Sequence, residues 1–176
     1  IKDLPRWVLW RFEERNGKRT KPPYQAANPN AHAKANDPTT WATYDETVAA
    51  AKDSDCGIGL MLSPADDHFS YVAFDLDDCR DLETGEVAGW AQELIDEAAS
   101  YTEITPSGTG FRVIGNGGTH AIHCKLERPD GGHVEVYSQA KRYITVTGDH
   151  VKTTPKTFNN LDDLVLRHKN ENDANK

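Results

Sequence analysis

Short runs of alternating or apolar residues predict a chain built mainly from strands. Alternation places successive side chains on opposite faces of a strand, whereas an unbroken apolar run indicates a strand buried on both faces. Residues 7–12 follow the first pattern and Tyr71–Phe74 the second. Extended segments are expected at 7–12 and 20–24, in CGIGLMLSP, in SYVAFDLDDC, on both sides of the Gly-rich loop in TEITPSGTGFRVIGNGG, in HVEVYS and in KRYITVTG.

Turn residues predict how these strands are joined. The basic stretch ERNGKR joins 7–12 to 20–24 as a hairpin, and a turn at Pro64–His68 leads into SYVAFDLDDC. HVEVYS and KRYITVTG are close in sequence, so they are expected to pair as a second hairpin. Because strands and helices mix without a regular rhythm, the pattern favours an α+β fold with a largely antiparallel sheet.

Caps and helical spacing predict three helices. Asp37 is the expected N-cap, and Pro38 the first residue, of a helix that runs to about Lys52. A second helix is expected over Val87–Ala99, where apolar residues recur at helical spacing. A modest amphipathic helix at Leu161–Leu166 follows, and the last eight residues are expected to be a polar tail.

The composition indicates a globular protein outside the membrane. Charged residues make up 27% of the chain and hydrophobic residues 37%, as is typical of globular domains. No apolar run approaches the ~18 residues that a membrane span needs, and no signal segment is apparent, so we expect a bacterial or host-cell cytoplasmic location. The three cysteines are widely spaced, which argues against a disulfide framework.

The charge distribution bears on whether the chain binds nucleic acid. A net charge of −8 argues against nucleic-acid binding by the surface as a whole. Basic residues are nevertheless bunched at 15–21 and at Lys141 and Arg142, and local charge decides binding more than the total does. The chain begins with Ile, so we expect it to be part of a longer protein.

An acidic cluster follows the apolar run at 71–74. Asp75 and Asp77 share one face of the strand. Carboxylates crowded at the end of a buried strand repel each other, so a positive partner is expected between them. A cap on a turn is the alternative interpretation. An EF-hand loop starting at Asp75 is excluded, because Arg80 stands where that loop needs Gly and a strand precedes it.

A third carboxylate, Glu135, lies in HVEVYS on the face that also carries His133 and Tyr137. By itself, it is interpreted as half of a cross-strand salt bridge. With Asp75 and Asp77 it completes a set of three carboxylates on strands, which is how two Mg²⁺ or Mn²⁺ ions are held for phosphoryl or nucleotidyl transfer. These three residues are the candidate catalytic residues and metal ligands.

The loop PSGTGFR offers donors for an anion. Ser107, Thr109 and Arg112 carry hydroxyl and guanidinium groups, and Gly108 and Gly110 let the backbone approach a phosphate. We therefore expect Ser107, Gly108, Thr109 and Arg112 to bind a nucleotide. A plain turn between two strands is the alternative, and a Walker loop is excluded because no GK[ST] follows.

Lys141 and Arg142 open KRYITVTG and, in the expected hairpin, lie next to Glu135. We expect them to neutralise a triphosphate or the template backbone, and solvated charge at a sheet edge is the alternative.

Two other chemistries find less support. A serine hydrolase would need a GxSxG elbow, which the chain lacks. A zinc site has candidate ligands whose spacing fits no standard pattern, namely His120, His123, Cys124 and His133.

Six segments together resemble a known family. RWVLWRFEERNGKRTKPPY, DPTTW, CGIGLML, VAFDLDDC, YTEITPSGTGFRVIG and VEVYSQAKRYITVTG occur in this order from about residue 5 to residue 150. The series resembles the primase-polymerase domain of phage- and plasmid-type replication proteins, in the archaeo-eukaryotic primase superfamily. Six blocks in the right order are more specific than any single motif.

The resemblance assigns roles to individual residues. Asp75 and Asp77 match the first acidic motif of the family, and Glu135 matches the single carboxylate of the third. Ser107 and its loop match part of the second motif, which handles the nucleotide. Arg112 stands where the family usually has His, so nucleotide affinity or its pH dependence is expected to differ, because arginine has no neutral imidazole form.

The resemblance also implies a fold and an activity. The fold is a small α/β lobe packed on an RRM-like antiparallel sheet lobe, with the active site in the cleft. The activity is that of a DNA primase or polymerase, a nucleotidyltransferase that uses two Mg²⁺ or Mn²⁺ ions, a single-stranded DNA template with primer, and nucleoside triphosphates. Residues 1–155 are expected to form the catalytic domain and 156–176 a C-terminal helix and tail.

Relatives often continue into a superfamily 3 helicase, so a helicase domain is expected in the full-length protein. Two alternative functions stay open at this point. One is a non-catalytic domain of the same fold that binds a replication origin, and the other is a metal-dependent nuclease.

Overall fold

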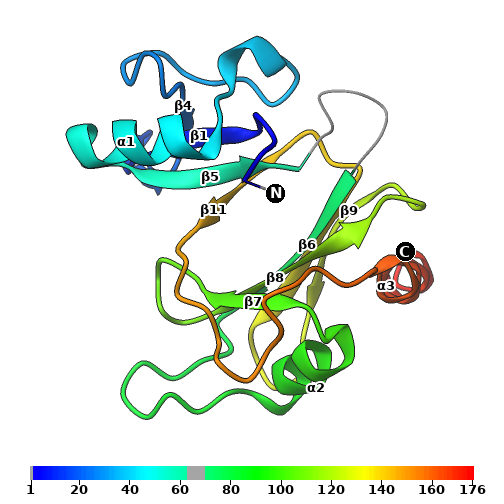
Figure 1. Cartoon of the computed structure of the whole chain (residues 1–176). Coiled ribbons are helices and arrows are strands. Elements are labelled where there is room, and N and C mark those ends of the chain that lie inside the picture. The colour runs from blue at the N-terminus through cyan, green and yellow to red at the C-terminus, as the bar shows by residue number, and fades with distance from the viewer. Residues whose placement is uncertain (1, 63–69) are drawn as a thin grey trace. The chain divides into compact units, whose positions relative to one another are not determined.

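The computed structural model of the chain describes residues 2–62 and 70–176 and divides into two units. The N-terminal unit comprises residues 1–67 with Lys141–Val146, and the C-terminal unit comprises 68–140 with 147–176. Figure 1 shows the helices and strands of each. The strands of both units pair antiparallel, and helices are few. The expected α+β class with antiparallel sheet is therefore confirmed.

The N-terminal unit is a four-stranded sheet with a helix beside it. The strand order is β11-β5-β1-β4. Helix α1 (Tyr44–Ser54) contacts β1 and β5, and the buried Val8 and Met61 pack with Trp41. The bounds of the strands are β1 Trp7–Trp10, β4 Pro23–Tyr24, β5 Gly57–Met61 and β11 Tyr143–Val146.

A tight turn at Asn16 and Gly17 joins β2 (Glu13–Arg15) to β3 (Lys18–Thr20). Both turn residues have positive φ, 52° and 71°, which a two-residue type I′ turn requires and Asn-Gly adopts readily. The hairpin expected across ERNGKR is thus confirmed. The expected pairing of 7–12 with 20–24 is also present, as β1 with β4.

The helix expected over 37–52 is wrong in its first part. Asp37 does cap a helical turn, but this is a single 3₁₀ turn at Pro38–Thr40. The α-helix starts only after Thr43, whose hydroxyl accepts the Glu46 backbone N–H while the Glu46 carboxylate accepts the Thr43 N–H. This capping box begins a new helix and so separates the two elements.

The C-terminal unit is a five-stranded antiparallel sheet with two helices packed on it (Figure 1). The strand order is β7-β8-β6-β10-β9. The strands are β6 Ser70–Asp77, β7 Tyr101–Ile104, β8 Phe111–Gly117, β9 Ile122–Glu127 and β10 His133–Ser138, and the helices are α2 Gly89–Ala98 and α3 Asp162–Ala174.

One face of this sheet is apolar because strand residues alternate in direction. Val72, Phe74 and Leu76 of β6 are fully buried and pack with Leu94 of α2 and Val165 of α3. Each fully buried side chain of this kind stabilises the fold by roughly 1.5–3 kcal/mol. The residues between them, including the acidic ones, face the other side of the sheet.

The hairpin expected between HVEVYS and KRYITVTG is wrong. Both segments are strands, but β10 pairs with β6 and β9, whereas β11 pairs with β5 of the N-terminal unit. Closeness in sequence favours pairing but does not dictate it, and here the chain passes from one unit to the other between the two strands. Strand β9, which was not predicted, occupies the position beside β10.

The last helix is longer than the sequence pattern indicated. α3 extends through most of the expected polar tail. Lys169 pairs with Asp173 at 2.7 Å within the helix, and Arg128 pairs with Glu171 at 2.7 Å. Such pairs stabilise a polar helical turn that has little apolar surface to bury. The domain boundary expected at residues 155 and 156 stays a prediction.

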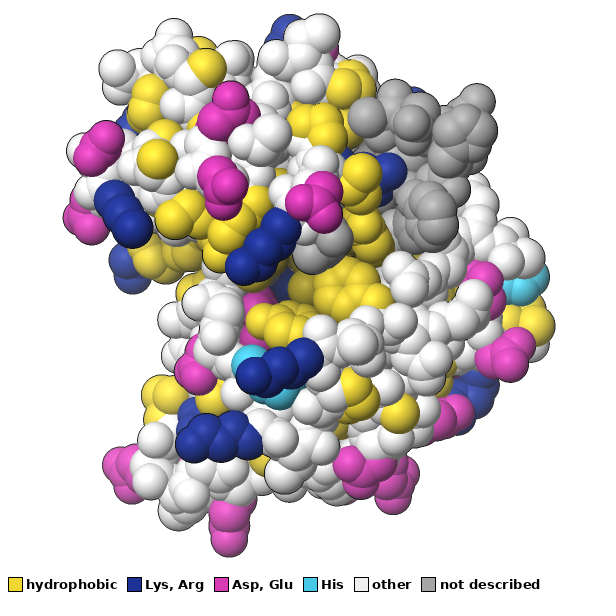
Figure 2. Space-filling model, in the orientation of Figure 1, with side chains coloured by type: hydrophobic (Ala, Val, Ile, Leu, Met, Phe, Trp, Pro, Cys, Tyr) yellow, Lys and Arg dark blue, Asp and Glu magenta, His cyan; other side chains and the backbone are white. Residues whose placement is uncertain are grey.

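The remaining expectations agree with the structure where it describes them. The strands expected in CGIGLMLSP, in SYVAFDLDDC and on both sides of the Gly-rich loop are present as β5, β6, β7 and β8, and α2 falls within Val87–Ala99. The turn at Pro64–His68 lies outside the described residues. Among the helices that the structure describes, none has the length and apolar character of a membrane span. Acidic and basic side chains are interspersed on the face shown in Figure 2.

Cysteine reactivity tests the burial in the C-terminal unit. Burial raises the pKa of the Cys79 thiol to about 12 and is the main cause of the raised pKa of Cys124. Because the thiolate is the reactive form, we expect iodoacetamide at pH 8 to modify the half-buried Cys56 well before the other two. Peptide mass spectrometry over time measures this order. Urea should make the three rates similar, and similar rates without urea would contradict the packing.

Candidate metal centre

The sheet face opposite α2 and α3 carries a row of charged residues, one from each strand. Residues paired across neighbouring strands lie side by side on the same face of a sheet. The register gives the order Glu103, Arg112, Asp75, Glu135 and Lys125, which we call the charged row. Negative and positive residues alternate along it except at Asp75 and Glu135, where two carboxylates are direct neighbours.

Arg112 is the positive neighbour of Asp75. Its Nη2 lies 2.6 Å from Asp75 Oδ2, and the two side chains are only 6% and 15% exposed. Burial works to lower the pKa of Arg112, but the charge and hydrogen bond of Asp75, with Glu103 beyond, outweigh it and raise that pKa. The guanidinium is therefore charged, and it holds one oxygen of the Asp75 carboxylate.

Glu103 fixes the outer end of the row. Its carboxylate is fully buried and accepts hydrogen bonds from the Tyr101 hydroxyl at 2.9 Å and from the backbone N–H groups of Thr147 and Gly148 at 2.9 and 3.1 Å. Three hydrogen bonds compensate a buried carboxylate for its lost hydration. The Glu103 carboxylate therefore has its hydrogen-bond partners within the protein.

The junction between Asp75 and Glu135 is different. Asp75 Oδ1 is buried and has no hydrogen-bond partner among the described residues. Glu135 accepts a hydrogen bond from the Tyr137 hydroxyl on the same face. Like charges directly opposite each other destabilise a sheet, and a buried carboxylate oxygen without a partner adds to the cost. The two carboxylates therefore favour a cation on this face.

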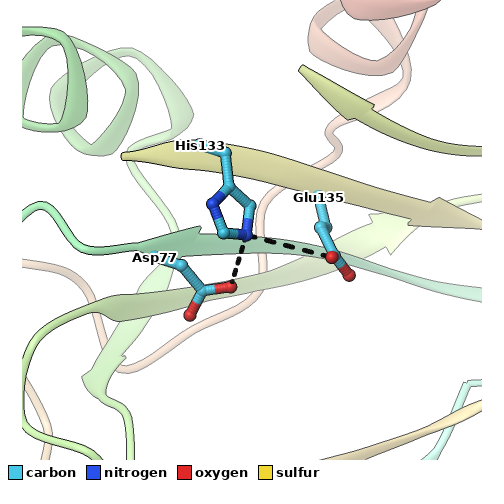
Figure 3. Close-up of side chains that lie close together, drawn as sticks. All are labelled: Asp77, His133 and Glu135. Atoms are coloured by element: carbon cyan, nitrogen blue, oxygen red, sulfur yellow. Dashed lines mark ion pairs between the residues drawn. The ribbon is translucent and has the colours of Figure 1, made fainter. Parts of the chain in front are cut away.

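Asp77, His133 and Glu135 point toward one another beside this junction (Figure 3). His133 is the cross-strand partner of Asp77. Its Nε2 lies 3.1 Å from Asp77 Oδ2 and 3.9 Å from Glu135 Oε1. One potential ligand atom from each residue lies within 4.8 Å of the other two. The side chains come from β6 and β10, two adjacent strands in the interior of the sheet.

The crowding affects the ionisation of Asp77. Burial raises the pKa of Asp77 above its ordinary value, and the charges of Asp75 and Glu135 raise it further. His133 and Arg112 lower it, but they do not outweigh these causes. The native fold thus holds Asp77 with less positive charge around it than its carboxylate would need to ionise at its ordinary pKa.

This donor set fits a hard divalent cation. Mg²⁺ and Mn²⁺ bind carboxylate oxygens and keep positions for water and phosphate. The unpartnered Oδ1 of Asp75 and the carboxylates of Asp77 and Glu135 offer such oxygens from rigid strands. The structure therefore places Asp77 and Glu135 in one group of potential ligand atoms and Asp75 opposite Glu135 on the neighbouring strand, while the binding of metal by all three stays a prediction.

The Gly-rich loop lies against the end of β6. The backbone N–H groups of Cys79 and Arg80 donate to the Thr109 carbonyl at 3.0 and 2.9 Å, and the Arg80 guanidinium donates to the Gly108 carbonyl at 2.8 Å. The loop therefore adjoins the backbone that directly follows Asp77 and Asp78. It lies next to the acidic strand, as the sequence predicted.

The backbone of this loop requires glycine at two positions. Gly108 has a positive φ of 78°, and a side chain at Gly110 would collide with the Leu76 carbonyl. Ser107 is exposed, and its hydroxyl lies 3.0 Å from that of Thr109. Both interpretations of the loop stay open on this geometry, so nucleotide binding by Ser107, Gly108 and Thr109 stays a prediction.

The basic residues that were expected to bind the nucleotide have different neighbours from those that the sequence predicted. Lys141 and Arg142 are exposed, belong to the N-terminal unit and precede β11. Their expected position beside Glu135 depended on the hairpin and is wrong. Arg112, expected to grip phosphate, is ion-paired with Asp75. The nucleotide-binding roles of all three stay predictions.

The sequence analysis missed two residues near the centre, Lys125 and Arg80, and missed the partner of a third. His133 was named for its face and as a candidate zinc ligand, but not as a neighbour of Asp77, a pairing that needs the register of two strands distant in sequence. Lys125 was missed because β9 was not predicted, although IHCKLE alternates. Arg80, bonded to the loop, carried no sequence signal.

Comparison with known proteins adds a relative. No protein-family model matches the chain. The chain is 38% identical over 156 residues to a protein of Nitratiruptor phage NrS-1 named DNA primase-polymerase. The match covers 85% of this chain and 20% of the phage protein, so the chain spans about a fifth of the relative's length. The resemblance to primase-polymerases that the six segments indicated is therefore confirmed.

The buried ion pair should be far more important for stability than an exposed one. Arg112→Ala leaves the buried Asp75 carboxylate without its partner, so we expect the free energy of unfolding to fall by about 3–5 kcal/mol. Arg15→Ala is the control, because its pair with Glu13 is 51% and 27% exposed and should matter by no more than about 1 kcal/mol. Urea unfolding measures both, and equal effects would contradict the burial of the charged row.

Asp77→Asn should stabilise the metal-free protein at pH 7. The raised pKa of Asp77 means that the native state binds its proton more tightly than the unfolded state does, so stability falls as pH rises above the ordinary value of 3.8. The gain from asparagine should therefore disappear toward pH 3, where both states are protonated. Urea unfolding with EDTA at several pH values tests this. A variant that gains more stability at pH 3 than at pH 7 would refute the assignment.

Proposed function

We propose, from this homology to a DNA primase-polymerase, that the chain is the catalytic domain of such an enzyme and transfers nucleotides to a growing strand on a single-stranded DNA template. The observation that carries the proposal is the junction of Asp75 and Glu135 in the charged row, next to Asp77 and His133. A domain that only binds DNA has no need of clustered carboxylates, which repel phosphate.

Asp75, Asp77 and Glu135 are the residues that would hold two Mg²⁺ or Mn²⁺ ions. When bound, these ions would supply positive charge to the triphosphate and make the attacking hydroxyl easier to deprotonate. The protein's own part is to fix the direction of these carboxylates. Arg112 orients Asp75 through the ion pair, and Tyr137 orients Glu135 through its hydrogen bond.

The Gly-rich loop is the proposed contact for the β- and γ-phosphates. Ser107 and Thr109 carry hydroxyl donors on the loop that adjoins the end of β6. Gly108, in the left-handed region, allows the loop its tight turn. Lys141 and Arg142 are proposed to add positive charge for the triphosphate or the template. Arg112 would take part in phosphate binding only while still neutralising Asp75.

The proposal includes the fold and partners of this family. The specific archaeo-eukaryotic primase fold, with an RRM-like sheet, is supported by a five-stranded antiparallel sheet that carries its helices on one face. The substrates are nucleoside triphosphates and a primed single-stranded DNA template. The replicating element would be a phage or plasmid, and a helicase domain would belong to the full-length protein.

A nuclease is the second candidate that the carboxylates favour, because metal-dependent hydrolysis of DNA uses similar ligands. A replication-origin binding domain is the third. Primer extension on a labelled template separates the three. A polymerase lengthens the primer, a nuclease shortens it, and an origin-binding domain retards a duplex in a gel without changing its length.

Asp77→Asn should reduce nucleotide incorporation by at least about a hundredfold, because the variant lacks a charged ligand while it keeps the side-chain volume. This substitution is preferable to alanine at Asp75, which would leave the buried Arg112 without its partner. Asp53→Asn, an exposed position in α1, is the matched control and should keep normal extension. Full extension by Asp77→Asn with a folded circular dichroism spectrum would refute the proposed function.

A further inference from the structure

We propose that His133 is a nitrogen ligand of the metal centre and that it makes the ion bound by Asp77 and Glu135 a transition metal such as Mn²⁺ in preference to Mg²⁺. The proposal rests on the proposed function for its site, and it assigns the metal class that the three carboxylates alone leave open.

The position of His133 supports a direct contact. Its Nε2 is the atom that lies 3.1 Å from Asp77 Oδ2 and 3.9 Å from Glu135 Oε1, and the ring points between the two carboxylates (Figure 3). The side chain is 17% exposed. The nitrogen therefore belongs to the same group of potential ligand atoms, all within 4.8 Å of one another.

The backbone around His133 holds it in place. Gly132 has a positive φ of 76°, and a side chain there would lie 2.6 Å from the Asp77 carbonyl oxygen. The turn before β10 can therefore pack directly on the end of β6 only because it contains glycine. The Trp90 indole N–H donates to the Gly131 carbonyl at 3.2 Å and ties the same turn to α2. His133 thus enters the centre from a fixed backbone.

The mixture of ligands determines the preferred ion. Mg²⁺ requires oxygen ligands and gives up its water reluctantly, so an imidazole in its coordination sphere is unfavourable. Divalent transition metals accept imidazole nitrogen together with carboxylate oxygen, with affinity that rises from Mn²⁺ toward Co²⁺ and Ni²⁺. A set of two carboxylates and one imidazole therefore favours the transition metals over Mg²⁺.

A second arrangement would place the same atoms together without metal selection. In it, a protonated His133 is only the counter-ion of Asp77, and metal binds to carboxylates elsewhere on the face. The charged groups around His133 are Asp77, Glu135 and the cross-strand partner Glu127 of β9. The two arrangements differ in whether the metal has a nitrogen ligand.

Mn²⁺ binding to the whole chain, without DNA or nucleotide, tests the proposal. Pulsed electron paramagnetic resonance of bound Mn²⁺ should show coupling to a ¹⁴N nucleus in the wild type. His133→Asn should lose this coupling and bind Mn²⁺ at least about tenfold more weakly, since even an outer partner of a metal ligand matters by that much. Competition between Mn²⁺ and Mg²⁺ should show that His133→Asn loses less affinity for Mg²⁺ than for Mn²⁺, because Mg²⁺ gains little from the imidazole.

His120→Asn is the matched control. It removes a histidine between β8 and β9 that lies outside the metal group, so coupling and affinity should stay as in the wild type. Bound Mn²⁺ without ¹⁴N coupling, or equal losses for Mn²⁺ and Mg²⁺ in His133→Asn, would overturn the proposal. These results do not depend on catalysis. If ¹⁴N coupling is present but primers are not extended, the proposed function fails and the assignment of His133 stands.

Discussion

The constraint on which the C-terminal unit depends is the direct opposition of two carboxylates, Asp75 and Glu135, across its two inner strands. Asp75 has the positive Arg112 as its neighbour on the outer side, and Glu135 has Lys125. In the row, no positive residue stands between the two carboxylates. Repulsion of this kind persists only in a sheet that other interactions stabilise. The opposite face provides them, since its buried aliphatic and aromatic side chains pack under both helices.

One face of the sheet packs against the helices, and the other face holds the candidate metal ligands in place. The candidate ligands project from strands whose register is fixed by neighbours on both sides, and such elements hold catalytic groups more rigidly than loops do. The candidate phosphate donors, by contrast, lie on a loop whose Gly108 and Thr109 carbonyls accept hydrogen bonds from Cys79 and Arg80, just after the end of β6.

Local patterns predicted the elements better than their partners. Alternation placed Glu135 and His133 on one face, and the run before Asp75 identified the central strand. No local signal could pair Asp77 with His133, because that contact depends on the register of strands far apart in the chain. The same limit explains the wrong hairpin, which placed Lys141 beside Glu135. The later start of α1, at Tyr44, could by contrast be predicted from the capping residues of TYDE.

The most direct test of the account is a crystal structure of the protein soaked in Mn²⁺ and a nucleoside triphosphate, with anomalous scattering used to locate the metal. We expect an anomalous peak on the face of the C-terminal sheet that lies opposite α2 and α3, in contact with oxygens of Asp75, Asp77 and Glu135. A well-ordered triphosphate with no anomalous peak beside these carboxylates, or with its metal bound elsewhere in the chain, would contradict it.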